Sequence, residues 1–224
     1  MFEVSVVVPV KYPAPYLNAC IESIMKQTYL PKEVILVETG DGTFTRTEVN
    51  SVVQIRQLRQ TGKGLAQAWN QGITNAKGSH VAFIDSDDEW DIDCLKNHEA
   101  ASRESDYMGG SIGKVIFSPV GEVPSGFRKS LLGECHLAYM PGCSVLSQEA
   151  LKGIGNFRED LGVTTDIEWF GRARGKLSFV EMKTTVLVKR VHTANLSYNA
   201  LETGAYQQDL TRALFALIKA KRQT

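Results

Sequence analysis

A strand, a helix and a second strand follow one another at the start of the chain, and this order constrains the fold most. Residues 4–10 (VSVVVPV) form a short β-branched run bounded by proline, which is typical of a buried strand. Residues 33–37 (EVILV) predict the next strand. Between them one apolar helix face is made by Leu17, Cys20, Ile21, Ile24 and Met25. Consecutive parallel strands need such a crossover, which is nearly always right-handed.

The alternation continues to about residue 104. We expect strands at 51–55 and 80–84 (HVAFI), a helix at 64–76, and a polar helix from Asp91 to about Glu104 with Ile92, Leu95 and Ala101 facing inward. This order predicts an α/β fold with a Rossmann-like, open, mostly parallel sheet flanked by helices.

The second half is expected to be a smaller region of mixed β structure. Strands are predicted at 107–118, 122–123, 177–181 and 184–191. One helix is predicted after a cap at Ser147 and another at 166–174. A C-terminal helix is predicted from one apolar face made by Leu210, Ala213, Leu214, Leu217 and Ile218. We interpret residues 1–224 as one domain, with a nucleotide-binding half (1–104) and a substrate-shaping half (105–224).

Composition excludes several classes of function. Lys+Arg and Asp+Glu are both 25, so the balanced charge gives no reason to expect a nucleic-acid partner. The 4 cysteines form no metal-ligand spacing and indicate a reducing, cytoplasmic location. We see no secretory signal and no transmembrane segment. The C-terminal helix has a basic end, so peripheral membrane contact or a homodimer stays open beside the favoured packing onto its own domain.

Three loops follow predicted strands at the sheet edge where ligands bind, namely residues 9–12, 38–43 and 85–88. In the third, DSDD follows HVAFI directly, and carboxylates this close repel one another unless a cation neutralises them. Carboxylate oxygens suit Mg²⁺ or Mn²⁺, which would bridge and neutralise a diphosphate there. Capping of the following helix by Asp88 or Asp91 is the alternative.

Two long stretches resemble glycosyltransferase family 2. They are SVVVPVKYPAPYLNACIESIMKQTYLPKEVILVETGDGT at residues 5–43 and TGKGLAQAWNQGITNAKGSHVAFIDSDDEW at residues 61–90. The resemblance implies a GT-A fold and an inverting transferase that uses a nucleotide-sugar donor, with a UDP-sugar as the first candidate. It implies a saccharide, a lipid-linked molecule or a small molecule as acceptor.

The resemblance also implies roles for single residues on the donor side. Pro9 would lie under the base, Asp85 and Ser86 would meet the donor, and Asp87 would ligate the metal. Lys63 and Asn70 would flank the stretch that faces the nucleotide, although TGKG alone favours a simple turn. The family's Asp-Asp-Gly-Ser is replaced by ETGDGT, so the base-contacting acid is either Glu38 or Asp41. Trp69 stands where the family often has Arg.

On the acceptor side the key segment is NFREDLGVTTDIEWFGRA, residues 156–173. The residues alone favour a helix cap for Asp166 and an exposed Glu168. The segment is similar to the family's "eD" element, which implies that Asp166 is the general base, with Thr165 in place of the usual Glu. Trp169 and Arg172 would lie on the acceptor side, with Gly142 in the pocket-lining loop 140–144.

Residues 189–197 (KRVHTANLS) resemble the family's "R.H..n.S" element. Arg190 and His192 alternate along a strand end, so both side chains can face one side. The resemblance places Arg190 near the donor diphosphate and allows His192 to ligate metal or phosphate. A non-catalytic nucleotide-sugar-binding module is the main alternative. A nucleotidyltransferase ranks below it, because no Gly/Arg/Lys-rich loop follows the first strand.

Overall fold

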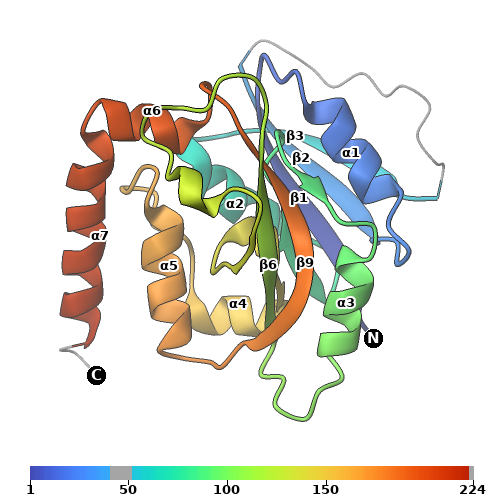
Figure 1. Cartoon of the computed structure of the whole chain (residues 1–224). Coiled ribbons are helices and arrows are strands. Elements are labelled where there is room, and N and C mark those ends of the chain that lie inside the picture. The colour runs from blue at the N-terminus through green and yellow to red at the C-terminus, as the bar shows by residue number, and fades with distance from the viewer. Residues whose placement is uncertain (41–51, 222–224) are drawn as a thin grey trace.

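The computed structural model describes residues 1–40 and 52–221 (Figure 1). In this part of the chain nine strands form one sheet, ordered β3-β2-β1-β4-β8-β6-β9-β5, with β7 beside β6. The strands are β1 (Val4–Lys11), β2 (Glu33–Thr39), β3 (Gln54–Arg59), β4 (His80–Phe83), β5 (Glu89–Trp90), β6 (Gly110–Pro119), β7 (Cys135–Leu137), β8 (Ser144–Ser147) and β9 (Val180–Val191). The helices are α1 (Leu17–Met25), α2 (Gly64–Asn75), α3 (Cys94–Ala101), α4 (Gln148–Ile154), α5 (Thr165–Arg174), α6 (Leu196–Glu202) and α7 (Ala205–Lys221).

The sheet is parallel in its first half and mixed in its second. Strand β1 pairs in parallel with β2 and β4, and β2 pairs in parallel with β3, as the alternation predicted. Strand β8 then pairs antiparallel with β4 on one side and with β6 on the other. The acceptor-side strands therefore extend the same sheet, and the sheet as a whole is more mixed than expected.

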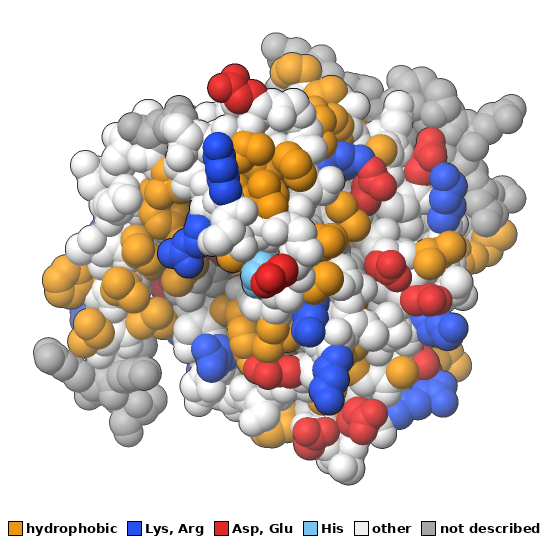
Figure 2. Space-filling view, viewed as in Figure 1, with side chains coloured by type: hydrophobic (Ala, Val, Ile, Leu, Met, Phe, Trp, Pro, Cys, Tyr) orange, Lys and Arg blue, Asp and Glu red, His pale blue; other side chains and the backbone are white. Residues whose placement is uncertain are grey.

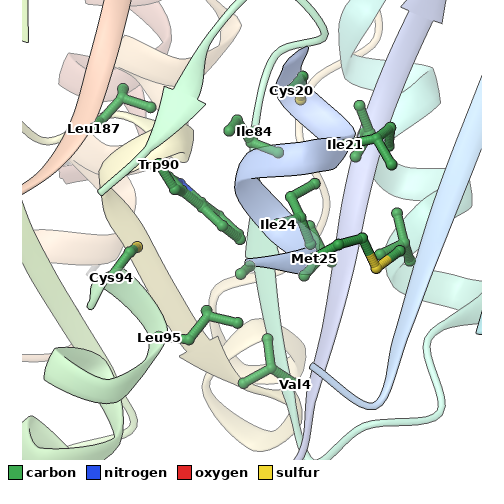
Figure 3. Close-up of a cluster of buried hydrophobic side chains, with 14 of the residues drawn as sticks. Val4, Cys20, Ile21, Ile24, Met25, Ile84, Trp90, Cys94, Leu95 and Leu187 are labelled. Carbon is green, nitrogen blue, oxygen red and sulfur yellow. The ribbon is translucent and has the colours of Figure 1, made fainter. Parts of the chain in front are cut away.

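Helices cover both faces of the sheet (Figure 1). Helices α1 and α3 share one apolar cluster with alternate residues of β1, including Val4, Val6 and Val8. Helices α2, α4 and α5 share the other cluster, which contains Val7 of the same strand. Figure 3 shows part of the first cluster, where Trp90 and Leu95 lie beside side chains of α1. Because successive side chains of a strand point to opposite faces, β1 contributes residues to two separate cores.

Several local predictions need correction. The predicted strand at 122–123 is wrong, because the backbone amide of Val120 bonds the carbonyl of Val191 and the chain then bends away. Strands predicted at 177–181 and 184–191 are one strand, β9, which follows β6 with two register irregularities. The third strand lies at 54–59 rather than 51–55.

The helix predicted from Asp91 begins only at Cys94. The backbone amide of Asp93 donates to the Asp91 carboxylate, and that of Thr28 donates to the carbonyl of Ile92. These bonds hold the segment outside the helix and leave Ile92 55% exposed, so its predicted inward orientation is wrong. Ser147 caps α4 as predicted, with its hydroxyl accepting from the amide of Ala150.

The C-terminal helix α7 packs along α5, at the left of Figure 1. Ala213 is fully buried there, and Leu217 lies over Gly171, where a Cβ would meet it at 2.6 Å. The favoured packing onto its own domain is confirmed. Leu214 and Ile218 were expected on the same face but are exposed, and hydrophobic side chains show on the surface over α7 in Figure 2. Among the described helices, none has both the length and the hydropathy needed to cross a bilayer.

Candidate functional site

Three carboxylates gather in the loop that joins β4 to β5. Oxygens of Asp85, Asp87 and Asp88 all lie within 4.8 Å of one another. The amide of Asp88 donates to the carbonyl of Asp85 at 3.0 Å, which folds the loop into a tight turn. Asp85 and Asp87 are partly exposed, whereas the Asp88 side chain is only 1% exposed. The predicted acidic cluster at the end of this strand is therefore present, with two members open to a ligand.

Strand β9 brings cations to this cluster from about a hundred residues away in sequence. Lys189 Nζ lies 2.7 Å from Asp88 and 3.2 Å from Asp85. The amide of Arg190 donates to Asp88 at 3.0 Å, and its guanidinium donates to the carbonyl of Asp87 at 2.8 Å and pairs with Glu89. Asp88 therefore ties the loop to β9, and it does not cap the following helix, which was the alternative interpretation.

Asp88 and Lys189 shift each other's pKa. Burial raises the pKa of Asp88 to about 7, since the neighbouring carboxylates of Asp85 and Asp87 add to the effect and Lys189 only partly opposes it. Burial alone would lower the pKa of Lys189, but the three carboxylates outweigh it and raise that pKa. Lys189 is therefore a firmly protonated counter-ion within an acidic pocket.

His192 and Asn195 both reach Asp87. His192 Nε2 lies 3.2 Å from Asp87 Oδ2, and Asn195 Nδ2 donates to the same oxygen at 3.0 Å. The Asn195 oxygen accepts from the amide of His192 at 2.8 Å, which fixes both side chains. Arg190 and His192 thus face one side, as their alternation predicted. A metal at Asp87 would have an imidazole nitrogen beside it.

The donor-side prediction places Pro9 and Glu38 at the carboxyl ends of β1 and β2. The parallel register pairs Pro9 with Val37 and Val10 with Glu38, so these positions lie side by side. Glu38 is buried and accepts a 2.8 Å hydrogen bond from the Tyr12 hydroxyl. Asp41 lies outside the described residues, so the choice between the two acids stays a prediction.

The remaining donor-side residues differ in their surroundings. Ser86 is partly exposed within the acidic loop, and Lys63 is exposed directly before α2. Asn70 is buried, and its amide donates to the carbonyl of Phe157 and accepts from the amide of Phe157, each at 2.9 Å. In this structure Asn70 therefore holds α2 to the segment after α4, and a donor contact for it stays a prediction.

Asp166 lies in the first turn of α5. Its Oδ1 accepts the amide of Ile167 at 2.9 Å, and the N-cap position is Thr164, so the capping interpretation of Asp166 is wrong. Burial raises the pKa of Asp166 to about 6, although the Ile167 amide opposes the shift and the charge of Asp85 adds to it. A carboxylate with this pKa is suited to accept a proton near neutral pH.

Two residues of α5 pack into the interior of the fold. Trp169 is fully buried, stacks on Phe157 and donates to the carbonyl of Gly155 at 2.7 Å, so it is a core residue, and its acceptor-side role stays a prediction. Glu168 was expected at the surface but is buried and paired with Arg172 at 2.8 Å.

Arg172 uses its remaining donors within the fold, on the carbonyls of Ile154 and Asn156, both at 2.7 Å. It therefore fixes the turn between α4 and α5. Gly142 lies against β5 and β9. Its carbonyl accepts from the indole of Trp90 in β5 at 3.0 Å, and a Cβ at Gly142 would meet Leu187 of β9 at 2.8 Å. An acceptor-side role for Arg172 and for Gly142 stays a prediction.

Sequence reasoning missed four residues of this site: Lys189, Asn195, Tyr12 and Tyr16. Lys189 and Asn195 lie inside the KRVHTANLS segment, and their partners became evident only from the approach of β9. The Tyr16 ring lies 5.2 Å from that of His192 and 5.1 Å from the Arg190 guanidinium. The tyrosines carry no spacing signal that would have singled them out.

Comparison with known proteins agrees with this geometry. The model of the family described as glycosyl transferase family 2 matches residues 5–130. Glycosyltransferase GlyG of Streptococcus pneumoniae is 42% identical over 90 residues, a match that covers 38% of this chain and 30% of that protein. An uncharacterized glycosyltransferase of Rickettsia typhi, RT0329, is 29% identical over 241 residues, which covers 96% of this chain and 75% of the relative.

Solved structures share the fold. S. aureus TarS 1-349 in complex with UDP-GlcNAc aligns with a TM-score of 0.65 at 20% identity, over 86% of this chain and 60% of that one. The mannosyltransferase PcManGT of Pyrobaculum calidifontis, in complex with GDP-Man and Mn²⁺, also gives 0.65, at 17% identity, over 97% of this chain and 64% of that one. The chain therefore has the GT-A fold and belongs to glycosyl transferase family 2, a family of sugar-transferring enzymes.

Proposed function

We propose that this protein transfers a sugar, with inversion, from a nucleoside-diphosphate sugar to an acceptor hydroxyl. The observation that carries the proposal is the meeting of three elements far apart in sequence. The acidic loop after β4, the cationic end of β9 and the carboxylate of Asp166 at α5 act on one another electrostatically. A diphosphate-bearing donor and a proton-bearing acceptor need these groups together.

The residues present fit a divalent cation. Asp85 and Asp87 offer partly exposed carboxylate oxygens, which suit hard cations such as Mn²⁺ and Mg²⁺, and His192 offers a nitrogen beside Asp87. We propose that Asp87 and Asp85 hold the ion, with His192 adjacent. When bound, the ion supplies positive charge that neutralises the leaving diphosphate.

The protein's own residues supply the rest of the chemistry. Asp166 takes the proton of the acceptor hydroxyl as its oxygen bonds to the anomeric carbon. The bond between that carbon and the diphosphate oxygen breaks on the opposite face, and the nucleoside diphosphate leaves with the bonding electrons. Arg190, fixed by its bonds to Asp87 and Glu89, presents positive charge on the diphosphate side.

The donor probes follow from the comparisons. TarS is described with UDP-GlcNAc and PcManGT with GDP-Man and Mn²⁺, so both nucleotide sugars are tested, with a UDP-sugar expected for this chain. The acceptor is proposed to be a saccharide, a lipid-linked molecule or a small molecule, and water serves as acceptor in the first assay.

The test measures release of UDP or GDP from each donor in the presence of Mn²⁺, for the wild type and for Asp166→Asn and Asp87→Asn. We expect Asp166→Asn to bind donor normally by calorimetry but to turn over about 100-fold more slowly. Asp87→Asn should lose Mn²⁺-dependent donor binding. The exposed Asp106→Asn is the matched control and should match the wild type.

Three outcomes would contradict the proposal. A full rate for Asp166→Asn would assign the base elsewhere, and Mn²⁺-independent donor binding that is unaltered in Asp87→Asn would remove the metal site. Donor binding without any nucleotide release from the wild type would favour a nucleotide-sugar-binding module instead.

A further inference from the structure

Helix α5 begins without a cap of its own. The N-cap residue, Thr164, makes no side-chain hydrogen bond to the amides of the helix's first turn. Amides at a helix start lack partners within the helix, so the start is held by contacts of the residues around it. Thr164 is fully buried, and Asp166 lies two residues further along. Whatever holds Thr164 therefore acts next to the proposed base.

The C-terminal helix supplies a carboxylate that holds the segment just before α5. Asp209 of α7 accepts the amide of Gly162 at 3.0 and 2.9 Å, one distance to each oxygen. It also accepts the amide of Thr164 at 3.0 Å and the Thr164 hydroxyl at 2.8 Å. Both carboxylate oxygens are thus used on the two residues that lead into α5.

Burial and shape show that this contact is specific. Asp209 is only 8% exposed, and a Cβ at Gly162 would lie 3.3 Å from its Oδ2, tighter than most such contacts. Burial alone would raise the pKa of Asp209, but the bonds from Gly162 and Thr164 outweigh it and hold that pKa below its usual value. Asp209 is therefore ionised at neutral pH and anchors the two residues that lead into α5, one of which, Thr164, is the N-cap residue.

We propose that Asp209 is a positioning residue for glycosyl transfer, which fixes the first turn of α5 and through it the carboxylate of Asp166. The proposal rests on the proposed role of Asp166 as base. Helix α7 packs along α5, and the pKa of Tyr206, one turn before Asp209, is raised by burial and further by the charge of Asp166. The C-terminal helix thus belongs to the acceptor side of the site.

The test compares Asp209→Asn with the wild type, because the amide keeps the side chain's size but turns one acceptor into a donor that faces backbone amides. Gln208→Ala, an exposed change on the same helix, is the matched control. Hydrogen exchange needs no substrate. We expect faster exchange of amides 162–168 in Asp209→Asn alone, with the amides of β1 and β2 unchanged.

The second readout is a double-mutant cycle on Mn²⁺-dependent nucleotide release from UDP-GlcNAc and GDP-mannose. Asp209→Asn should lower kcat about 10-fold with the KM for donor unchanged, and should cost nothing further in an Asp166→Asn background. A merely structural role would lower the rate equally in both backgrounds.

Each result decides the inference. Unchanged exchange of amides 162–168 overturns the anchoring by Asp209, and an equal loss of rate in both backgrounds overturns its action through Asp166. A wild-type rate for the single variant Asp166→Asn overturns the proposed base, and exchange at 162–168 then still reports separately on the anchoring by Asp209.

Discussion

Replacing Lys189 with Met should destabilise the protein in a way that depends on pH and on Mn²⁺. The Lys189 ammonium is 14% exposed and lies 2.7 Å from the carboxylate of Asp88, which is 1% exposed. Methionine keeps the apolar stem and removes the charge. Within residues 1–40 and 52–221, the amide of Arg190, at 3.0 Å, is then the one remaining hydrogen-bond donor to the Asp88 carboxylate, which still faces Asp85 and Asp87.

Breaking a buried ion pair by removing one partner costs about 3–5 kcal/mol. We expect about 3 kcal/mol, the low end, because Asp88 retains one hydrogen bond and can take up a proton. The pKa of Asp88 is about 7 in the fold, above the ordinary Asp value of about 3.9. For an acid with a raised pKa, the stabilising contribution is complete at low pH and is lost as pH rises through the folded value. Without Lys189 that pKa rises further, so the deficit should be larger at about pH 8 than at about pH 6.

Urea unfolding measures this deficit. With a slope of about 2–3 kcal/mol per molar urea, the midpoint should fall by about 1 M at pH 8. Mn²⁺ should raise the midpoint of Lys189→Met by more than that of the wild type, because the ion replaces the missing charge and binds only the folded state. Lys183→Met on the same strand is exposed and should change the midpoint little. A Lys189→Met midpoint equal to that of the wild type at pH 8 would refute the reasoning.

Four further outcomes are expected. The rate of nucleotide release should rise with pH through about 6 as Asp166 loses its proton, and a flat pH–rate profile would speak against it as base. Asn70→Leu should lose about 2 kcal/mol in urea unfolding, because the amide and carbonyl of Phe157 are left unpaired; an unchanged midpoint would mean that water replaces the side chain. The pKa of Glu33 is lowered by its hydrogen bonds to Arg56, Ser5 and the Lys77 amide, despite burial. Its stabilisation should therefore be present at neutral pH and fade below about pH 4, and Glu33→Gln should remove this acid dependence. Ser147→Ala should cost about 1 kcal/mol through loss of the α4 cap, read from the thermal midpoint.

Local patterns were enough to predict the architecture of the first half. The run at residues 4–10 and the apolar spacing from Leu17 to Met25 are short-range signals, and both elements are observed. Predicted element boundaries were wrong where a hydrogen bond competed with the sequence pattern. Before α3, for example, the amide of Asp93 donates to the Asp91 carboxylate and the helix starts later. The acidic loop was also predictable, because four polar residues directly after a buried strand must lie at the sheet's edge.

The partners of these residues depended on tertiary structure. Helix capping was the alternative for Asp88, but β9 passes beside it and brings Lys189 and the amide of Arg190 from about a hundred positions away. Trp169 was placed on the acceptor side, and the structure shows that it fills the core between α5 and Phe157. The apolar period of a helix does not indicate which other segments of the chain will pack against its faces.

The sequence by itself therefore determined the strand-helix order, the acidic strand end and the family. Only the folded chain decided that Lys189 pairs with the acidic loop and that Asp209 bonds the residues leading into the helix that bears Asp166. The reason is physical: periodicity is a property of neighbours along the chain, whereas burial, pKa and ion pairing depend on which segments pack together.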